Sequence, residues 1–406
     1  MTPVRWLLAA ALLAAPAAAE DLLRLPIGDP ARKGREAPVV LDAITDTASG
    51  AVLTPADLPG RLAAARLVIV GEGHTDMDSH RVERRVIEEL HRAGRKVAIG
   101  LEMFPYTEQK ALDDWSAGRL SEDEFLAASR WYRNWGYNWL YYRDIFLFAR
   151  DNRLRMIAVN APRDAVSAVR KKGFRGLTPE EAAHIPTEID AGNPDHLRLF
   201  KASFDDESFH AAMNDEQWQA MLNAQCTWDA TMGWNAVQPL LRDDDPKSAV
   251  VVLAGAGHVQ YGLGIERQAR QWFRGGIASV IPVAVAEEKK GPVGSVQASY
   301  ANFVWGTPAE TDPLYPELGI STRAREDDKR LEIIDVEEGS PAERAGLKVK
   351  DVLLSLDGAA VTDRETLARL MAGKRWGDAA VFTLRREDAP TSVTVLLRRT
   401  AEKPAR

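Results

Sequence analysis

Short apolar runs that end in glycine-containing turns set the pattern of the first 285 residues. Residues 67–70 are apolar and lead into the string GEGH at 71–74, and residues 249–254 lead into the string GAGH at 255–258. Both strings have the form G-x-G-H, and each follows a run that is typical of a buried strand. Two such copies, in a chain with 29 glycines and 7 histidines, are the strongest local signal in the sequence.

Strands and helices are predicted to alternate through this part of the chain. A helical apolar spacing follows the first string and a further strand comes next, so we expect a parallel pair with a right-handed crossover. The predicted strands are 67–70, 97–101, 156–159, 249–253 and 279–285, and the predicted helices are 79–94, two within 106–130, one from Thr178 and a long one at 215–241, with a short helix or turn at 41–48. The fold class is therefore α/β, a parallel sheet flanked by helices with a helical insertion.

The last quarter of the chain has a different pattern. Residues 287–312 are rich in Gly, Pro, Ser and charge, which predicts a linker. After it, short β-type runs alternate with turns, which predicts a small β-rich domain at 313–400. Its predicted strands are 331–336, 352–356, 381–384 and 393–397, and its clear helix is 363–372. The expected domains are thus 20–286 and 313–400.

Composition agrees with two globular domains and narrows the class of partner. A chain of 406 residues is long for one core. A net charge of −7 argues against nucleic acid as a main partner. Cys226 is the only cysteine, so no intramolecular disulfide can form, and its helical context beside Trp228 predicts a small buried apolar group rather than a nucleophile.

Residues 1–19 have the pattern of a secretory signal peptide. Arg5 precedes a short apolar run, and Ala17-Ala18-Ala19 follows it before Glu20. The run is shorter than the roughly 20 residues that span a bilayer. Because no cysteine follows the predicted cleavage site, a lipoprotein anchor there is excluded. The mature protein is expected to be soluble and periplasmic, with no membrane anchor after cleavage.

Three predicted strand ends carry side chains that suit a reaction site. They are His74, Glu102 and His258. In an open parallel sheet, ligands bind outside the carboxyl ends of the strands, and the glycines beside these residues permit tight turns and close approach of a ligand. Two imidazoles and a carboxylate are a ligand set for a divalent metal ion, or a general base with an orienting carboxylate. The alternative is that these histidines only hydrogen-bond the backbone of glycine-rich turns.

An aromatic stretch at 131–148 also has two interpretations. Its tryptophans recur every four residues, which is typical of core packing. Its tyrosines Tyr132, Tyr137, Tyr141 and Tyr142, mixed with Arg133 and Arg143, suit the wall of a haem site, because haem needs apolar faces, an axial ligand and cations for its propionates. The candidate cofactor-binding residues are Tyr132, Tyr137, Tyr142 and Arg143.

Several strings in this region together resemble one family. GEGH at 71–74, GLEMF at 100–104, the W-x-x-x-W-G-x-x-W run at 131–139, WDATM at 228–232 and GAGH at 255–258 resemble the ChaN-type haem-binding uptake domain of the Tiki superfamily. The resemblance implies an α/β fold and binding of haem or a metal ion, in haem or iron uptake at the cell envelope. The superfamily also contains metalloproteases and erythromycin-esterase-like hydrolases. Their paired G-x-x-H motifs and glutamate match His74, His258 and Glu102, so the alternative function is a metal-dependent hydrolase or peptidase.

The C-terminal domain resembles a PDZ domain. Leu318-Gly319-Ile320 matches the carboxylate-binding loop, the segment 339–358 matches the strand, helix and turn that follow, and Leu367 lies on the helix that would form the other wall of the groove. The resemblance implies binding of a protein C-terminus or peptide. Two alternatives remain, a PDZ-like fold used only for interdomain packing, and a pure interaction protein whose α/β domain has lost its chemistry.

Overall fold

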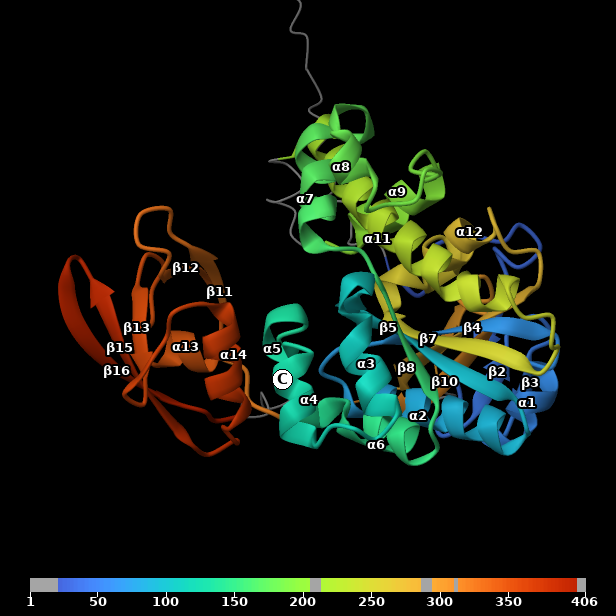
Figure 1. The fold of residues 1–406 in the computed structure, drawn as a ribbon, viewed down its shortest axis with the longest axis horizontal. Coiled ribbons are helices and arrows are strands. Elements are labelled where there is room, and N and C mark those ends of the chain that lie inside the picture. The colour runs from blue at the N-terminus through green and yellow to red at the C-terminus, as the bar shows by residue number, and fades with distance from the viewer. Residues whose placement is uncertain (1–20, 205–212, 286–293, 310–312, 400–406) are drawn as a thin grey trace, which may run out of the picture.

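The computed structural model describes residues 21–204, 213–285, 294–309 and 313–399 (Figure 1). The predicted signal peptide lies outside these residues. An α/β domain holds most of the described chain, and a smaller β-rich domain, red in Figure 1, stands to one side of it. Among the helices of the described ranges, none is long and apolar enough to cross a bilayer.

The α/β domain is built on an eight-stranded sheet. Its order is β3-β2-β10-β8-β4-β7-β5-β6, parallel from β10 to β6 and antiparallel at β2 and β3. The strands are β2 (Ile44–Asp46), β3 (Ala51–Leu53), β4 (Ala65–Glu72), β5 (Lys96–Pro105), β6 (Arg155–Asn160), β7 (Ser248–Gly255), β8 (Gly276–Val285) and β10 (Phe303–Pro308). All five predicted strands are present, in the predicted parallel arrangement.

Both faces of this sheet are buried. Successive side chains of a strand point to opposite faces, so Val68 and Val70 of β4 join one core while Leu67 and Ile69 join the other. The first core includes the helices α1 (Leu58–Arg61), α2 (Met77–Arg92), α3 (Gln109–Ser116), α4 (Glu122–Ala128), α5 (Trp131–Asn134) and α6 (Arg143–Asp151). The second includes α9 (Pro194–Ala202), α11 (Asp215–Leu241) and α12 (Ile265–Ala269). Burial on both faces explains why the strands read as continuous apolar runs.

The helix ends follow the local capping chemistry. Ser121 and Glu124 form a capping box at the start of α4. Helix α2 begins two residues before the predicted start, because the Asp76 side chain accepts a hydrogen bond from the backbone N–H of Asp78 at 2.9 Å. The long helix α11 has the predicted bounds. The remaining helices of this domain are α7 (Arg163–Lys172), α8 (Pro179–Ala182) and the 3-10 helices η1 (Pro55–Asp57), η2 (Tyr106–Glu108), η3 (Trp139–Tyr141), η4 (Phe174–Gly176), η5 (Ala256–His258) and η6 (Gln260–Gly262).

The sheet edge differs from the predictions in two places. The segment 287–312, predicted as a linker, contains β9 (Ser295–Gln297) and β10, and β10 lies inside the large sheet between β8 and β2. Its apolar run at 303–305 pairs with strands distant in sequence, a contact that Gly- and Pro-rich flanks conceal. Residues 41–48, predicted as a short helix or turn, hold strand β2 with turns on both sides of it and no helix. Strand β9 pairs with β1 (Glu36–Pro38) in a separate two-stranded sheet.

The β-rich domain is an antiparallel sheet with two helices. The order is β11-β12-β13-β15-β16, with β14 paired to β13. Its elements are β11 (Ile320–Ala324), β12 (Leu331–Val336), α13 (Pro341–Arg344), β13 (Val352–Leu356), β14 (Ala359–Ala360), α14 (Arg364–Ala372), β15 (Ala379–Arg386) and β16 (Ala389–Leu396). Strand β11 is at the edge of the sheet, and α14 lies beside α5 of the α/β domain (Figure 1).

Candidate functional site

Three neighbouring parallel strands bring the predicted site residues together. Strand β7 lies between β4 and β5, so their carboxyl ends meet at one edge of the sheet. His74 follows β4, Glu102 lies near the end of β5, and His258 ends η5, directly after β7. His258 Nε2 is 3.3 Å from Glu102 Oε1, and Glu102 Oε2 accepts a hydrogen bond of 2.6 Å from the backbone N–H of Gly255. The structure therefore places these three residues at one edge of the sheet.

Glycine is needed at position 255 for space, not for backbone conformation. A Cβ on Gly255 would lie 2.8 Å from His74 Cε1, 3.1 Å from His74 Nε2 and 3.7 Å from Glu102 Oε2. Gly71, Gly73, Gly255 and Gly257 all lack the positive φ that a glycine-dependent tight turn requires. Tight turns do follow both strings, since the backbone N–H of Asp76 donates to the Gly73 carbonyl at 3.0 Å and that of Val259 to the Ala256 carbonyl at 2.9 Å, but they do not depend on a positive φ of these glycines. Gly255 instead lets the His74 ring approach the end of β7.

A carboxylate anchors each histidine ring through its Nδ1 atom. His74 Nδ1 is 2.7 Å from Glu72 Oε1, and His258 Nδ1 is 2.6 Å from Asp229 Oδ1. Asp229 is fully buried and comes from α11, 29 residues before His258. Sequence reasoning did not assign it to the site. The available signal was one acidic residue among the apolar positions of WDATM. In each ring, the Nε2 atom therefore faces Glu102.

The electrostatics make His258 and Glu102 an ion pair at neutral pH. Burial lowers the pKa of His258, but the charges of Glu102 and Asp229 outweigh burial and raise the pKa to about 10. Burial raises the pKa of Glu102, yet His258 and His74 hold it below its ordinary value. The pKa of His74 is also raised, because its bond to Glu72 outweighs its burial.

A fully buried cluster supports His74 from behind. His80 Nδ1 lies 3.2 Å from Glu72 Oε2 and 2.9 Å from Glu83 Oε2, and the hydroxyl of Tyr142 donates to Glu72 Oε1 at 2.8 Å. Burial lowers the pKa of His80, but Glu72 and Glu83 raise it to about 10. Glu72 accepts from more donors than Glu83, so it carries the negative charge while burial keeps the pKa of Glu83 well above its ordinary value. This charged cluster fixes the ring of His74 through Glu72.

A crevice opens at the same edge of the sheet. Its volume is about 480 Å³, and Glu102 and His258 lie on its floor. Trp135 and Trp228 line it, and Arg133 and Arg163 stand at its rim. The lining also includes Arg130, which pairs with Glu108, and Asp164, so the crevice combines aromatic surfaces with charges of both signs. His74 does not line the crevice, because its ring packs against Trp135 at 4.8 Å and Tyr137 at 5.0 Å. Its side chain is 28% exposed.

The predicted cofactor-binding residues lie mostly elsewhere. Tyr142 is fully buried in the core, and Arg143 is paired with Glu122 at the start of α6. Tyr132 packs against the first core, and neither it nor Tyr142 nor Arg143 lines the crevice. Tyr137 reaches the site through its ring contact with His74, and Tyr142 reaches it only from the core side, through hydrogen bonds of its hydroxyl to Glu72 and the His74 carbonyl. The placement of Tyr142 and Arg143 disagrees with a role as cofactor wall, because their side chains serve the core and a local ion pair.

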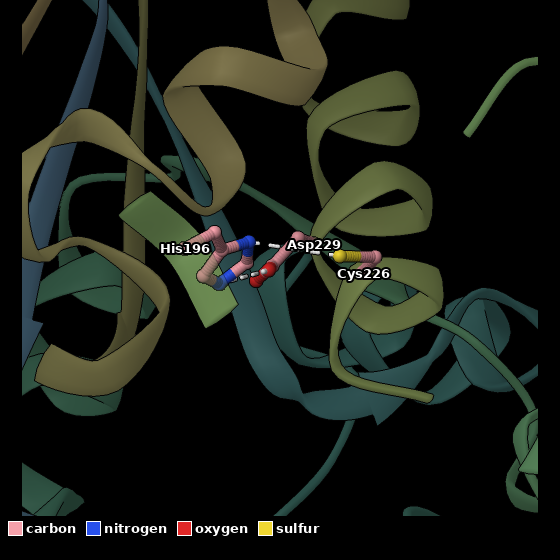
Figure 2. A group of neighbouring side chains, drawn as sticks. All are labelled: His196, Cys226 and Asp229. Atoms are coloured by element: carbon pink, nitrogen blue, oxygen red, sulfur yellow. Dashed lines mark hydrogen bonds and ion pairs between the residues drawn. The ribbon is translucent and has the colours of Figure 1, made fainter. Parts of the chain in front are cut away.

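A second group of side chains continues from Asp229 away from the crevice. Figure 2 shows His196 beside Asp229 and Cys226, with His196 Nδ1 3.6 Å from Cys226 Sγ and His196 Nε2 3.8 Å from Asp229 Oδ2. The guanidinium of Arg267 lies 3.0 Å from His196 Nδ1, where it would repel a cation. Burial raises the pKa of the Cys226 thiol to about 12, which agrees with the predicted inert, buried cysteine.

Compact groups of metal-ligating atoms exist, but the predicted trio is not one of them. Among the described residues, the groups whose ligand atoms lie within 4.8 Å of one another are Glu72, His80 and Glu83, and His196, Cys226 and Asp229. His74, Glu102 and His258 converge less tightly. Binding of one metal ion by all three requires their side chains to draw together.

The β-rich domain has the loop that the sequence predicts. Gly319 has φ +71°, and a Cβ there would lie 2.2 Å from Ser340 Cβ, so only glycine fits. The Gly319 N–H has no hydrogen-bond partner among the described residues. Leu318, Ile320 and Leu367 line one groove together with Gly319. A free N–H beside an edge strand is the arrangement that accepts an added peptide strand.

The fold and the site define an α/β protein with a crevice of charged and aromatic residues at its strand ends. A small β-rich domain of the peptide-binding type follows it. The family model described as "Haem-binding uptake, Tiki superfamily, ChaN" matches residues 58–268, just over half of the chain, and a PDZ domain model matches residues 316–397. The chain therefore belongs to the ChaN haem-binding uptake family of the Tiki superfamily, and it carries a C-terminal PDZ domain.

Individual relatives are distant. The chain is 25% identical over 219 residues to Protein RETICULATA-RELATED 5, chloroplastic, of Arabidopsis thaliana, covering 50% of this chain and 28% of that protein. It is 30% identical over 123 residues to a probable periplasmic serine endoprotease DegP-like of Rhizobium meliloti (strain 1021), covering 30% and 23%. The chain thus spans about a quarter of the length of these curated relatives.

Solved structures of both types are similar to parts of the chain. ChaN of Campylobacter jejuni, solved with cofacial haem, has 18% identity and a TM-score of 0.48, covering 64% of this chain and 95% of that one. The PDZ domain of HtrA3 bound to a phage-derived ligand has 16% identity and a TM-score of 0.18, covering 20% of this chain and 83% of that one.

Proposed function

We propose that the crevice at the strand ends binds haem, in haem or iron handling at the cell envelope. The observation that carries the proposal is the lining of the crevice in a member of the ChaN family. Trp135 and Trp228 offer flat apolar surfaces, and Arg133 and Arg163 have no ion-pair partner among the described residues. Haem requires both, because its faces are apolar and its propionates bind cations. A volume of about 480 Å³ is within the usual range for ligand sites.

Arg163 stands at a position where a positive charge lowers stability, which indicates a functional role. It is the first residue of α7, where the helix dipole disfavours positive charge. Burial lowers its pKa, and the charges of Arg364 and Arg133 lower the pKa further. An anionic ligand at the rim would relieve this repulsion.

The side chains of the crevice suit the porphyrin faces and the propionates of haem, but they do not provide a clear ligand for its iron. The His258 imidazole is held protonated by Glu102 and Asp229, and a protonated ring has no lone pair for a metal. Bound haem would supply redox or ligand-binding chemistry at its iron. The protein supplies Trp135 and Trp228 against the porphyrin and Arg133 and Arg163 toward its carboxylates.

Charge reversal on α7 separates binding from folding. Arg163→Glu should weaken haem binding about tenfold while raising the unfolding free energy by a few tenths of a kcal/mol. Absorption titration with haem and chemical denaturation measure the two quantities. Arg170→Glu, an exposed arginine on the same helix, is the control and should keep wild-type affinity. Equal affinities for both variants would contradict a role of Arg163 in the site.

The PDZ domain is proposed to bind a protein C-terminus or peptide along β11. Support comes from the free N–H of Gly319, the edge position of β11 and the family match. Residues 1–19 are proposed to direct export to the periplasm, on the sequence pattern alone. Mass spectrometry of the protein isolated from the cell envelope tests this, since a mature chain that begins at Glu20 is expected.

A second candidate function is metal-dependent hydrolysis. Its support is the anchoring of His74 and His258 by carboxylates at Nδ1, an orientation common among metal-ligating histidines. Binding of the ion would have to displace the proton of His258; two Nε2 atoms and Glu102 would then hold the ion, leaving a position for water. Stoichiometric metal that is lost in the double variant His74→Ala/His258→Ala, together with metal-dependent cleavage of a peptide, would favour this candidate over haem binding.

A further inference from the structure

The PDZ groove is bounded by both domains. A cavity of about 490 Å³ lies between β11 and α14, and residues of the α/β domain close one of its sides. From the PDZ domain it is lined by Leu318, Leu367 and Met371, and from the α/β domain by Thr75, Tyr137 and Asn138. A peptide in this groove therefore touches a surface that an isolated PDZ domain does not have.

Specific contacts hold this shared wall in place. The Asn138 side chain donates a hydrogen bond of 3.2 Å to the carbonyl of Ala372, at the end of α14. The backbone N–H of Tyr315 donates to the hydroxyl of Tyr141 at 3.1 Å, and the two rings lie 4.9 Å apart. The guanidinium of Arg375 covers the Tyr315 ring at 5.1 Å. The wall is thus tied to the PDZ domain at both ends of η3.

The wall also continues directly to the site in the α/β domain. Thr75 is the residue after His74, and the Tyr137 ring is 5.0 Å from the His74 ring. Trp131 Nε1 donates a hydrogen bond of 2.8 Å to the carbonyl of Tyr137, which fixes the turn at 136–137 against the core. Tyr137 is therefore a rigid part of the groove rather than a loose loop residue.

The charges that line the groove are mainly negative. Glu317, Asp335 and Glu337 lie along it and have no cationic partner among the described residues. Burial and the charge of Glu337 both raise the pKa of Glu317. The only basic residue of the lining is Arg364, which donates to the carbonyl of Thr322. An occupant with positive side chains would relieve this repulsion.

We propose that the groove and the wall at 136–138 form one composite site for the C-terminal segment of a partner protein, with an apolar last residue preceded by Lys or Arg. The proposal rests on the proposed peptide binding of the PDZ domain. Edge strand β11 supplies main-chain hydrogen bonds, Glu317 and Glu337 attract the basic side chains, and the Tyr137 ring packs against the peptide. The α/β domain thereby takes part in choosing the partner.

Fluorescence anisotropy with the full chain and labelled ten-residue peptides tests the proposal. One peptide ends in valine with lysines at the second and fourth positions from its end, and a second carries glutamates at these positions. The basic peptide should bind wild type about tenfold tighter than the acidic one. Glu337→Lys should remove most of this preference. Its control is Glu338→Lys, a neighbouring exposed residue outside the groove, which should keep the preference.

The role of the wall is tested in the same assay. Tyr137→Ala should weaken the basic peptide about fivefold to tenfold, and Tyr137→Phe should keep wild-type affinity, which shows that the ring and not an unfolded variant is responsible. Tyr106→Ala, outside the groove, is the control. Unchanged affinity in Tyr137→Ala, or equal binding of both peptides by wild type, overturns the composite site but leaves PDZ peptide binding intact. Binding of neither peptide by wild type overturns both.

Discussion

Glu72→Gln should destabilise the protein by about 3–5 kcal/mol, whereas the same replacement at Glu83 should cost less than about 1 kcal/mol. Both side chains are fully buried, and both lie against His80 Nδ1. Glu72 also accepts from Tyr142 and pairs with His74, so it is the charged member. Its loss removes the carboxylate that both His74 and His80 contact. Glu83 is held protonated by burial, and a glutamine is a close substitute for a protonated glutamate.

Denaturant unfolding of wild type and the two variants at pH 7 measures the difference. The pH dependence checks its cause. The pKa of His80 is raised from its ordinary value to about 10, so its contribution to stability is complete below about pH 6.5 and is lost as pH rises through 10. The wild type should lose stability across this window, and Glu72→Gln should lose less, because Glu83 alone raises the His80 pKa by a smaller amount. Equal destabilisation by both substitutions would show that the charge is not on Glu72.

Trp131→Ala should destabilise the protein by about 3–5 kcal/mol. Trp131 is fully buried at the centre of the aromatic core, with its ring 5.0 Å from Trp139, 5.4 Å from Tyr142 and 5.7 Å from Phe104. Truncation removes these contacts, leaves a cavity, and deletes the Nε1 hydrogen bond to the Tyr137 carbonyl. The wall between the crevice and the PDZ groove should then lose its fixed position.

Trp234→Ala provides the matched comparison. Trp234 is 36% exposed, so its truncation should cost less than about 1 kcal/mol in the same denaturation experiment. Trp131→Phe keeps a ring but removes the Nε1 donor, and it should fall between the two. Losses of similar size for Trp131→Ala and Trp234→Ala would mean that the aromatic stretch is not the core of this domain.

The sequence predicted the strand ends of the site because their signals are local. A β-branched run followed by G-x-G-H marks a strand and its turn, and the bounds of α11 follow from its capping residue and apolar content. Asp229, the partner of His258, has no such local signal. Asp229 meets His258 only because α11 crosses the ends of the strands, and that crossing is set by packing over the whole domain.

The misplaced residues have similar physical reasons. Strand β10 forms because β8 and β2 leave a place between them, although its own flanks resemble a linker. Tyr142 and Arg143 are adjacent in sequence, yet one points into the core and the other to Glu122, since α6 begins between them. Spacing alone cannot assign the direction of side chains at such a junction. Of the rim arginines, Arg133 belongs to the aromatic stretch that suggests a haem wall, whereas Arg163 has no local pattern and emerges only from the folded crevice.

Absorption titration of the purified full chain with haem, in wild type and Trp228→Ala, tests the central claim most directly. Trp228 lines the crevice and its ring is 6.3 Å from that of His258, whereas Trp234 lies on the same helix outside it. We predict saturable binding by wild type, binding at least about tenfold weaker by Trp228→Ala, and wild-type affinity in the control Trp234→Ala. Absence of saturable binding by wild type, or equal affinity in Trp228→Ala and wild type, would contradict a haem site in the crevice.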